Sequence, residues 1–244
     1  MSEPMPDNGA VDVWTVPLEL PPPTVSRLRG TLSEEEVERL RRSRSDAERR
    51  RFIVAHGALR RILGGYLGEP PEDLRWTRGP HGKPRLAGTD SHLRFNLSHA
   101  GELGLVAVTS RGEVGVDVDL PRSGMPVRSF AARYFPEAEA DMVAGAGPSQ
   151  ARAAFLRLWT RKEAVVKAAG GRVVQGLRLP VATSGSGAAS GAIVVRDPTG
   201  TIAGTWSVQD LPMPGEYAAA VAVEGRRAPM VTVRASFRAP LPET

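Results

Sequence analysis

The stretch Val114-Gly115-Val116-Asp117-Val118-Asp119-Leu120 alternates apolar and acidic residues. Because side chains two apart in a β-strand share a face, it predicts a strand with valines on one face and Asp117 and Asp119 on the other. Aspartate is depleted in strands, and two neighbouring carboxylates repel each other by about 1–4 kcal/mol. A bound cation would remove that cost. An exposed amphipathic edge strand is the alternative interpretation.

The segment from Phe155 to Lys167 predicts a helix that carries a third carboxylate. Residues four apart share a helix face. One such stripe begins with the rings of Phe155 and Trp159, which can anchor the helix in a core. It ends with the carboxylate of Glu163 and the ammonium of Lys167. An ordinary helix-stabilising i,i+4 ion pair is the alternative interpretation of these last two residues.

Together, the strand and the helix offer a set of groups suited to phosphate chemistry. Oxygen ligands suit Mg²⁺, which usually keeps waters and substrate phosphates in its coordination shell. Asp117, Asp119 and Glu163 could together supply three carboxylates to such an ion. A lysine beside such a metal binds phosphate, so Lys167 is the predicted phosphate ligand. Phosphoryl transfer requires this combination of positioning and charge neutralisation.

The order of predicted elements along the chain indicates an α+β fold. Helices precede strands twice, which predicts two halves of similar plan, residues 1–111 and 112–244. Residues 1–30 are expected to form an irregular lead-in with one strand, because prolines are frequent there. A strand is expected at residues 173–179 and a flexible loop at residues 184–191.

The composition limits the classes of function. The chain has 244 residues and no cysteine, which excludes disulfides and thiolate chemistry and favours the cytoplasm. No apolar run is long enough to span a bilayer, so no membrane association is expected. The net charge is +5, and arginines are concentrated between Arg39 and Arg61. Such a patch attracts phosphorylated molecules, acidic proteins or nucleic acid, or it is a solvated helix face.

Four segments of the chain resemble motifs of the 4′-phosphopantetheinyl transferase superfamily, and specifically of its larger, surfactin-synthetase-activating type. They follow one another along the chain in the same order as in the family. The family pattern combines a Gly-apolar-Asp strand motif, here residues 114–119, with a Trp-(Ser/Cys/Thr)-x-Lys-Glu-(Ala/Ser)-x-x-Lys helix motif, here residues 159–167. Gly82-Lys83-Pro84 and Phe95-Asn-Leu-Ser-His-Ala-Gly101 also match, and the helical Arg50-Arg51-Phe52 region fits the same type. One departure is Asp119, where many members of this type have glutamate.

The resemblance implies an enzyme that moves 4′-phosphopantetheine from coenzyme A to a serine of an apo acyl or peptidyl carrier protein, releasing 3′,5′-ADP. It implies two α/β halves related by a pseudo-twofold axis, each with a small antiparallel sheet on a long helix, and a cleft between them. It also implies a monomer whose partners are coenzyme A and acidic carrier proteins.

The resemblance further implies individual roles for the matching residues. The metal ligands are Asp117, Asp119 and Glu163. The catalytic residues are Asp117, Glu163 and Lys167. The residues that bind coenzyme A are Arg51, Lys83, Pro84, Ser98, His99 and Lys167.

Two other functions use the same residues. A coenzyme A-binding protein without transfer activity is one, although intact carboxylates and Lys167 argue against it. A basic nucleic-acid-binding module is the other. Aromatic residues make up only 5% of the chain and no nucleic-acid motif accompanies the arginines, so we expect no nucleic-acid partner. A serine hydrolase at Ser98 is disfavoured because no Gly-x-Ser-x-Gly elbow surrounds it.

Overall fold

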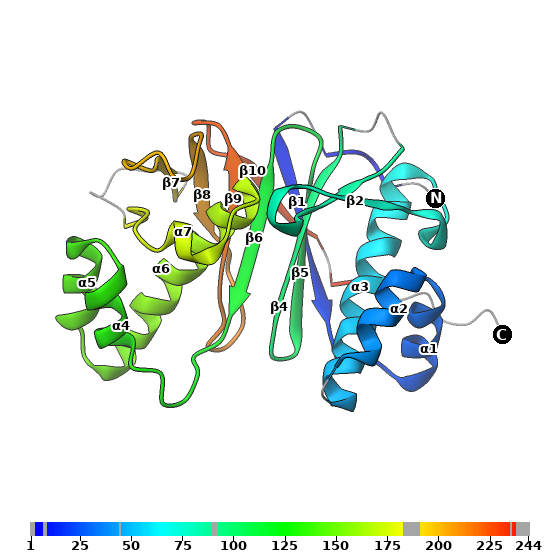
Figure 1. Ribbon diagram of the computed structural model, residues 1–244, viewed down its shortest axis with the longest axis horizontal. Helices are drawn as coiled ribbons and strands as arrows, with labels where there is room; N and C mark the ends of the chain where they lie inside the picture. Colours follow the sequence, from blue (N-terminus) through cyan, green and yellow to red (C-terminus); the bar gives the residue numbers. More distant parts are fainter. Residues whose placement is uncertain are drawn as a thin grey trace.

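The computed structural model describes residues 3–6, 9–43, 45–88, 92–182, 191–234 and 236–237. Two sheets lie side by side in the middle of the molecule, and helices cover their outer faces (Figure 1). The helices are α1 (Pro22–Gly30), α2 (Glu34–Arg41), α3 (Asp46–Leu67), α4 (Val127–Tyr134), α5 (Glu137–Ala144), α6 (Pro148–Ala169) and α7 (Val173–Gly176). Short 3₁₀ turns are present at Pro71–Asp73 and Pro80–Gly82.

The first sheet has the strand order β10-β1-β5-β4, and the second has the order β6-β9-β8-β7. Their strands are β1 (Ala10–Pro17), β4 (Arg94–Ala100), β5 (Leu103–Thr109), β6 (Val114–Asp119), β7 (Ala192–Val195), β8 (Trp206–Asp210), β9 (Ala218–Glu224) and β10 (Met230–Arg234). A separate hairpin pairs β2 (Trp76–Arg78) with β3 (Pro84–Leu86). Pairing is antiparallel except between β1 and β10, which run parallel.

Each sheet packs its outer face on one long helix. Helix α3 covers the first sheet and α6 the second, and each has 22 residues. Both helices end at a glycine in the left-handed conformation, Gly68 and Gly170, because glycine has no Cβ to oppose a positive φ. The α+β prediction and the plan of two similar halves are confirmed.

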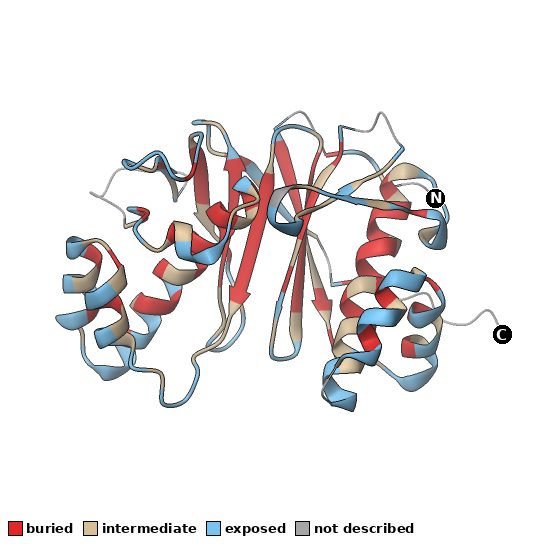
Figure 2. Cartoon of the chain, in the orientation of Figure 1, coloured by how far each residue is buried: buried red, intermediate tan, exposed pale blue. Residues whose placement is uncertain are grey.

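The core consists of three apolar layers. One lies between α3 and the first sheet, and another between the second sheet and α6. The third lies between the two sheets, where Val11 and Val13 of β1 meet Val116 and Val118 of β6. Figure 2 shows these buried strands at the centre of the molecule, with exposed helix faces outside. The valine face of β6 is therefore buried between the halves, as its alternating pattern predicted.

Two local predictions were wrong. The lead-in contains helix α1, because Pro22 and Pro23 occupy its first turn, where a missing N–H costs nothing. The strand expected at residues 173–179 is instead helix α7 followed by a turn, stabilised by a bond from the Arg172 N–H to the Gln175 side chain. Most of the flexible loop expected at residues 184–191 lies outside the described residues.

The end of the chain returns to the first half. Strand β10 pairs with β1, and Arg234 donates a 2.7 Å hydrogen bond to the buried carboxylate of Asp12. The boundary at residue 112 stays a prediction. Strand β10 follows the second sheet in the sequence but lies in the first sheet, so the chain connects the two sheets a second time. Among the described residues, no helix is both long enough and apolar enough to cross a membrane.

Candidate active site

A glycine brings the helix carrying Glu163 onto the acidic strand. On β6, Gly115 shares a face with Asp117, and this face is covered by α6. A Cβ at Gly115 would collide with the carbonyl oxygen of Ala164 and the amide nitrogen of Ala168. The missing side chain therefore lets α6 lie directly on β6, and Glu163 and Lys167 come with it. This explains in physical terms why the strand motif begins with glycine.

Asp117 and Lys167 meet at the centre of this contact. The Lys167 ammonium lies 2.6 Å from Asp117 Oδ1 and also donates to Ser98 Oγ at 2.8 Å. The Ser98 hydroxyl donates to the same aspartate oxygen at 2.8 Å. The site thus joins three elements, β4, β6 and α6, and both halves contribute to it.

The other oxygen of Asp117 is unsatisfied. Oδ2 is buried and has no hydrogen-bond partner among the described residues. Burial raises the pKa of Asp117, although Lys167 and Ser98 oppose this effect and Asp119 adds to it. A buried carboxylate oxygen without a donor is costly unless a cation or an ordered water satisfies it. This oxygen therefore fits a metal ligand.

Glu163 is the second buried carboxylate of the site, with 8% of the residue exposed. Burial, and then the neighbouring charge of Asp117, raise its pKa to about 7, while Lys167 lowers it and Asp119 raises it further. No described residue donates a hydrogen bond to Glu163. Its charge therefore has little compensation, and a bound cation would favour the ionised form.

Asp119 lies at the rim of the site. Its Oδ1 accepts a 2.8 Å hydrogen bond from the N–H of Leu120, and its Oδ2 lies 3.7 Å from the guanidinium of Arg122. Among the residues that the structure describes, no three acidic or histidine side chains come as close together as a metal ion requires. The ammonium of Lys167 occupies one face of Asp117 instead. The predicted set of three metal ligands stays a prediction.

The sequence analysis missed Asn96, which joins the two halves. Its Oδ1 accepts a 3.0 Å hydrogen bond from the N–H of Val116, and Ser98 Oγ accepts one of 3.3 Å from the N–H of Val118. Two side chains of β4 thus satisfy the open edge of β6. The signal was present in the alternation Asn96-Leu-Ser98, which places both polar side chains on one strand face. Ser98 was predicted to contact coenzyme A, and in the structure it is buried against Asp117 and Lys167.

A group of positive side chains lies on the other face of β4. The pKa of His99 is lowered by desolvation and then by the charges of His56, Lys167 and Arg51. Arg51 is half-buried and forms no hydrogen bond or ion pair with a described residue. A guanidinium without an anionic partner, next to a histidine whose pKa is lowered by nearby positive charge, is an environment suited to a phosphate.

Lys83 does not present a free ammonium. Its Nζ lies 2.7 Å from Glu113 Oε2 and donates to the carbonyl oxygens of Val114, at 3.0 Å, and Ala168, at 2.7 Å. Burial lowers its pKa, and Glu113 opposes that effect. The lysine thus ties its loop to the start of β6 and the end of α6. Pro84 follows it as the first residue of β3.

Lys162, the neighbour of Glu163 in the helix motif, also forms a buried structural contact. Its ammonium lies 2.6 Å from Glu139 Oε2 of α5 and 4.6 Å from the ring centre of Phe135. The pKa of Lys162 is lowered by burial and raised by Glu139. The ion pair between Lys162 and Glu139 holds α5 against α6, on a different face of α6 from the one that carries Glu163 and Lys167.

An apolar cleft opens beside Asp119 and was not anticipated from the sequence. Its lining residues belong to α6, to the end of β6 and to the segment that follows β6. Its lining includes Leu120, Met125, Val127, Phe155, Leu156 and Trp159, together with the cationic residues Arg122 and Arg152. An apolar channel that ends at a carboxylate is suited to a chain-like organic group.

Comparison with known proteins identifies the class. Residues 113–222 match the model of the 4′-phosphopantetheinyl transferase superfamily, and residues 22–111 match that of the 4′-phosphopantetheinyl transferase N-terminal region. The chain is 37% identical over 165 residues to the 4′-phosphopantetheinyl transferase HetI of Nostoc sp., covering 67% of this chain and 70% of that protein.

Two further relatives agree. The putative 4′-phosphopantetheinyl transferase slr0495 of Synechocystis sp. is 31% identical over 166 residues, which is 68% of this chain and 67% of that protein. The 4′-phosphopantetheinyl transferase AcpT of Salmonella typhimurium is 40% identical over 97 residues, or 40% of this chain and 50% of that protein. The chain therefore belongs to the 4′-phosphopantetheinyl transferase superfamily, as its motifs predicted.

Proposed function

We propose that this chain transfers 4′-phosphopantetheine from coenzyme A to a serine of an apo carrier protein through Asp117, Glu163 and Lys167. One observation carries the proposal. Asp117 binds Lys167 through one oxygen, and its second oxygen is buried near Glu163 with no partner among the residues that the structure describes. This arrangement offers both a cation site and a positioned ammonium at the junction of the two halves.

Asp117, Asp119 and Glu163 would hold Mg²⁺, with Mn²⁺ as the alternative. The unsatisfied Oδ2 of Asp117 and the raised pKa of both buried carboxylates support this assignment, because a cation would relieve each of them. When bound, the metal neutralises charge on the diphosphate and on the leaving group. Asp119 is one methylene shorter than the glutamate of many relatives, so it would reach the metal either directly or through a water molecule.

Lys167 would bind the diphosphate. Its ammonium is held by Asp117 and Ser98, which fix its position at the end of the Glu163 stripe. There it stabilises the negative charge that develops on departing 3′,5′-ADP. Ser98 acts through Asp117 and Lys167 in this proposal, as a positioning residue.

Glu163 would be the general base. The serine hydroxyl attacks the β-phosphorus of coenzyme A, and a new P–O bond forms as the bond to the bridging oxygen breaks. That oxygen leaves with 3′,5′-ADP, and Glu163 accepts the serine proton directly or through water. The pKa of about 7 is that of the metal-free carboxyl, and a bound cation would keep Glu163 ionised and therefore able to accept this proton. No covalent enzyme intermediate is required.

Coenzyme A would lie across the two halves. Arg51 and His99 bind its 3′-phosphate, and Pro84 with the backbone of Lys83 borders the adenine and ribose, because the Lys83 ammonium is already engaged. The pantetheine arm follows the apolar cleft beside Asp119. Residues 1–111 would thus bind the nucleotide, and residues 112–244 the metal and diphosphate.

The carrier protein is expected to be acidic around its serine. A net charge of +5 favours its approach by electrostatic steering. We propose that the enzyme works as a monomer in the cytoplasm, because one chain supplies both halves of the site.

The test is incubation with an apo carrier protein, coenzyme A and Mg²⁺, followed by intact mass of the carrier. We expect a gain of one phosphopantetheine, and no gain when EDTA replaces the metal or when Asp117→Ala replaces the wild type. An unchanged carrier mass with every carrier of a panel would contradict the transfer activity. Near-wild-type turnover by Asp117→Ala would contradict the metal assignment.

A further inference from the structure

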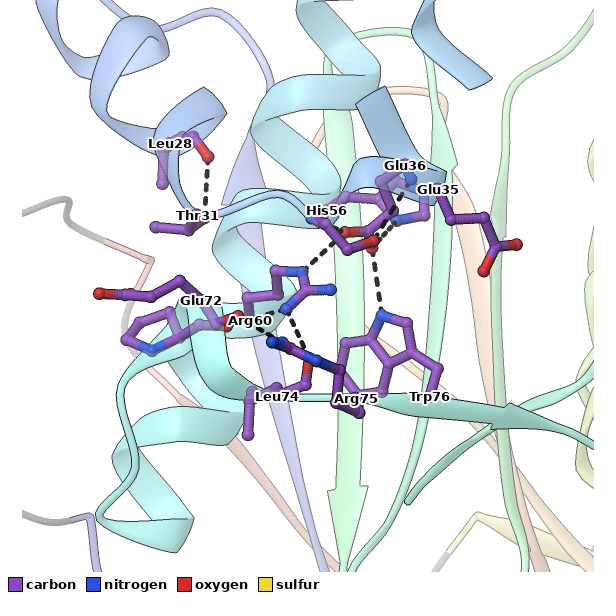
Figure 3. Close-up of polar contacts among 12 residues, drawn as sticks. Leu28, Thr31, Glu35, Glu36, His56, Arg60, Glu72, Leu74, Arg75 and Trp76 are labelled. Carbon is purple, nitrogen blue, oxygen red and sulfur yellow. Dashed lines mark hydrogen bonds and ion pairs between the residues drawn. The ribbon is translucent and has the colours of Figure 1, made fainter. Parts of the chain in front are cut away.

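The buried carboxylate of Glu36 in α2 contacts two basic side chains of α3, Arg60 and His56. Its carboxylate accepts hydrogen bonds from Arg60 Nε at 2.7 Å and from the backbone N–H of Ser33 at 2.9 Å. Trp76 Nε1 donates to it at 3.2 Å, and His56 Nδ1 lies 3.3 Å away. Figure 3 shows Arg60 and His56 reaching this carboxylate from the same helix.

The two cations differ in what else they contact. Arg60 is fully buried, and it donates at 2.9 Å to the carbonyl oxygens of Pro71 and Leu74. Its guanidinium also lies over the Trp76 ring, 5.0 Å from the ring centre. Arg60 is thus enclosed by structural contacts. Among the described residues, Glu36 is the polar partner of His56, and 18% of the His56 side chain is exposed.

The bond to Glu36 determines which nitrogen of His56 is available. Although burial raises the pKa of Glu36, hydrogen bonds from His56 and Ser33 and the charge of Arg60 lower it to about 2, so the carboxylate is ionised. An ionised carboxylate only accepts, and therefore Nδ1 of His56 carries a proton and donates it. Nε2, on the opposite side of the ring, is the nitrogen left for another partner.

The surroundings of His56 point toward the coenzyme A side of the site. The ring stacks on Phe52, one turn earlier in α3, with centres 3.9 Å apart, and the Arg39 guanidinium lies 5.4 Å from the Phe52 ring centre. Helix α3 covers the face of β4 that carries Phe95, Leu97 and His99, since the first two pack in the core layer beneath α3. His56 and His99 therefore belong to the same layer.

The charges of this layer are one-sided. Positive charge on His56, Lys167 and Arg51 acts on His99 and lowers its pKa, in addition to desolvation. The Arg39 guanidinium lies over the Phe52 ring on which His56 stacks, and the charges of Arg51 and Lys167 act on His99. Glu36 already accepts from four donors and Asp117 is paired with Lys167, so within the described part of the chain Arg51 and His99 are left without an anionic partner.

We propose that His56 is a specificity-determining residue for the 3′-phosphate of coenzyme A, which it binds through Nε2 while Glu36 holds Nδ1. The proposal rests on the proposed function and extends it to a residue outside the segments that resemble the family. In a row of carboxylate, imidazole ring and phosphate, Glu36 orients the ring through Nδ1–H, and the phosphate accepts from Nε2–H. Arg51 and His99 complete the anion site.

Two substitutions at His56 separate the roles of its nitrogens. The amide of Asn in His56→Asn can replace Nδ1 and keep the bond to Glu36, but nothing replaces Nε2. The amide of Gln in His56→Gln reaches the place of Nε2 as a neutral donor. His92→Gln, at an exposed histidine of the loop before β4, is the matched control. Thermal melting followed by circular dichroism identifies the variants that are folded.

The readout is the Michaelis constant for coenzyme A and for 3′-dephospho-coenzyme A. We expect His56→Asn to raise the KM for coenzyme A about tenfold, the usual worth of a hydrogen bond to a charged group, with kcat and the KM for the dephospho substrate unchanged. His56→Gln is expected to give a smaller rise, and His92→Gln none. Equal rises for both substrates, or an unchanged KM ratio in folded His56→Asn, would overturn the proposal.

Calorimetric titration separates a failure of this proposal from a failure of the transfer activity. It compares binding of 3′,5′-ADP with binding of 5′-AMP and requires no catalysis. We expect wild type to prefer 3′,5′-ADP, and His56→Asn to lose about tenfold of this preference. A wild type that lacks transfer activity but keeps this His56-dependent preference would contradict only the proposed function. A preference that His56→Asn retains in full would contradict only the role of His56.

Discussion

Glu36 and Glu163 are both buried glutamates, and their surroundings are opposite. Glu36 accepts hydrogen bonds from four donors, including Arg60 at 2.7 Å, and its pKa falls to about 2. No described residue donates to Glu163, and its pKa rises to about 7. A satisfied buried carboxylate stabilises the fold, whereas an unsatisfied one is an energetic cost that only a ligand can offset.

The same contrast separates the two lysines of α6. Lys162 is enclosed by Glu139 and the ring of Phe135, and it fastens two helices together. Lys167 is partly exposed, with 28% of its side chain accessible, and its partners Asp117 and Ser98 are site residues. Proximity in a motif therefore does not assign a role, while the completeness of each side chain's contacts does.

The largest expected effect is on stability. Glu36→Ala leaves Arg60 buried without its partner, so we expect a loss of about 3–5 kcal/mol in the free energy of unfolding. Glu163→Ala removes an uncompensated charge, and we expect its free energy of unfolding to match or exceed that of the wild type. Urea denaturation of both variants without metal measures the difference. Equal destabilisation by the two substitutions would contradict the conclusion that Glu36 stabilises the fold and Glu163 does not.

The next effect is on activity. Glu163→Gln keeps the size of the side chain and removes both the metal-binding charge and the proton acceptor. We expect kcat to fall at least about 100-fold, the loss seen when one group that stabilises a transition state is removed. Continuous measurement of 3′,5′-ADP release provides the rate. Glu139→Gln, at a buried glutamate outside the site, is the control for general effects of charge removal.

The smallest effect is on pH dependence, where the two glutamates have opposite signs. The pKa of Glu36 is about 2 in the folded state, against 4.5 as its ordinary value, so its stabilisation is complete above pH 4.5 and is lost as the pH falls toward 2. The pKa of Glu163 is raised from 4.5 to about 7. Its ionisation therefore destabilises the metal-free fold progressively from pH 4.5 to 7, by roughly 3 kcal/mol at most.

The measurement for this effect is a series of urea titrations of metal-free protein between pH 5 and pH 8. Comparison with Glu163→Gln isolates the contribution of that one carboxyl, since glutamine does not titrate. We expect wild type to lose stability relative to Glu163→Gln as the pH rises. Parallel curves for the two proteins would mean that Glu163 has an ordinary pKa.

Much of the fold followed from periodicity in the sequence. The valines of β6 predicted a buried face, and the stripe from Phe155 to Lys167 predicted the position of α6. The short α7 was missed because its local pattern resembles a strand, whereas in the structure Gly176 packs so closely on Val166 that a Cβ there would collide with it.

The candidate site was partly predictable for the same reason. The face shared by Asp117 and Asp119 follows from strand geometry, and the packing of α6 on Gly115 brings Glu163 to that face. The engagement of Lys83 and the bond between Ser98 and Asp117 were not predictable, because both join residues far apart in the chain. Such contacts depend on how the two sheets pack, which local patterns do not encode.

The central claim is that β6 and α6 share one divalent ion with a diphosphate. Electron paramagnetic resonance of Mn²⁺ in the presence of coenzyme A tests it directly, by counting free and bound metal. We predict one Mn²⁺ per wild-type chain, and at least tenfold weaker binding, or about 1.4 kcal/mol, for Asp117→Ala and for Glu163→Gln. Binding of Mn²⁺ by both variants with wild-type affinity would contradict the account.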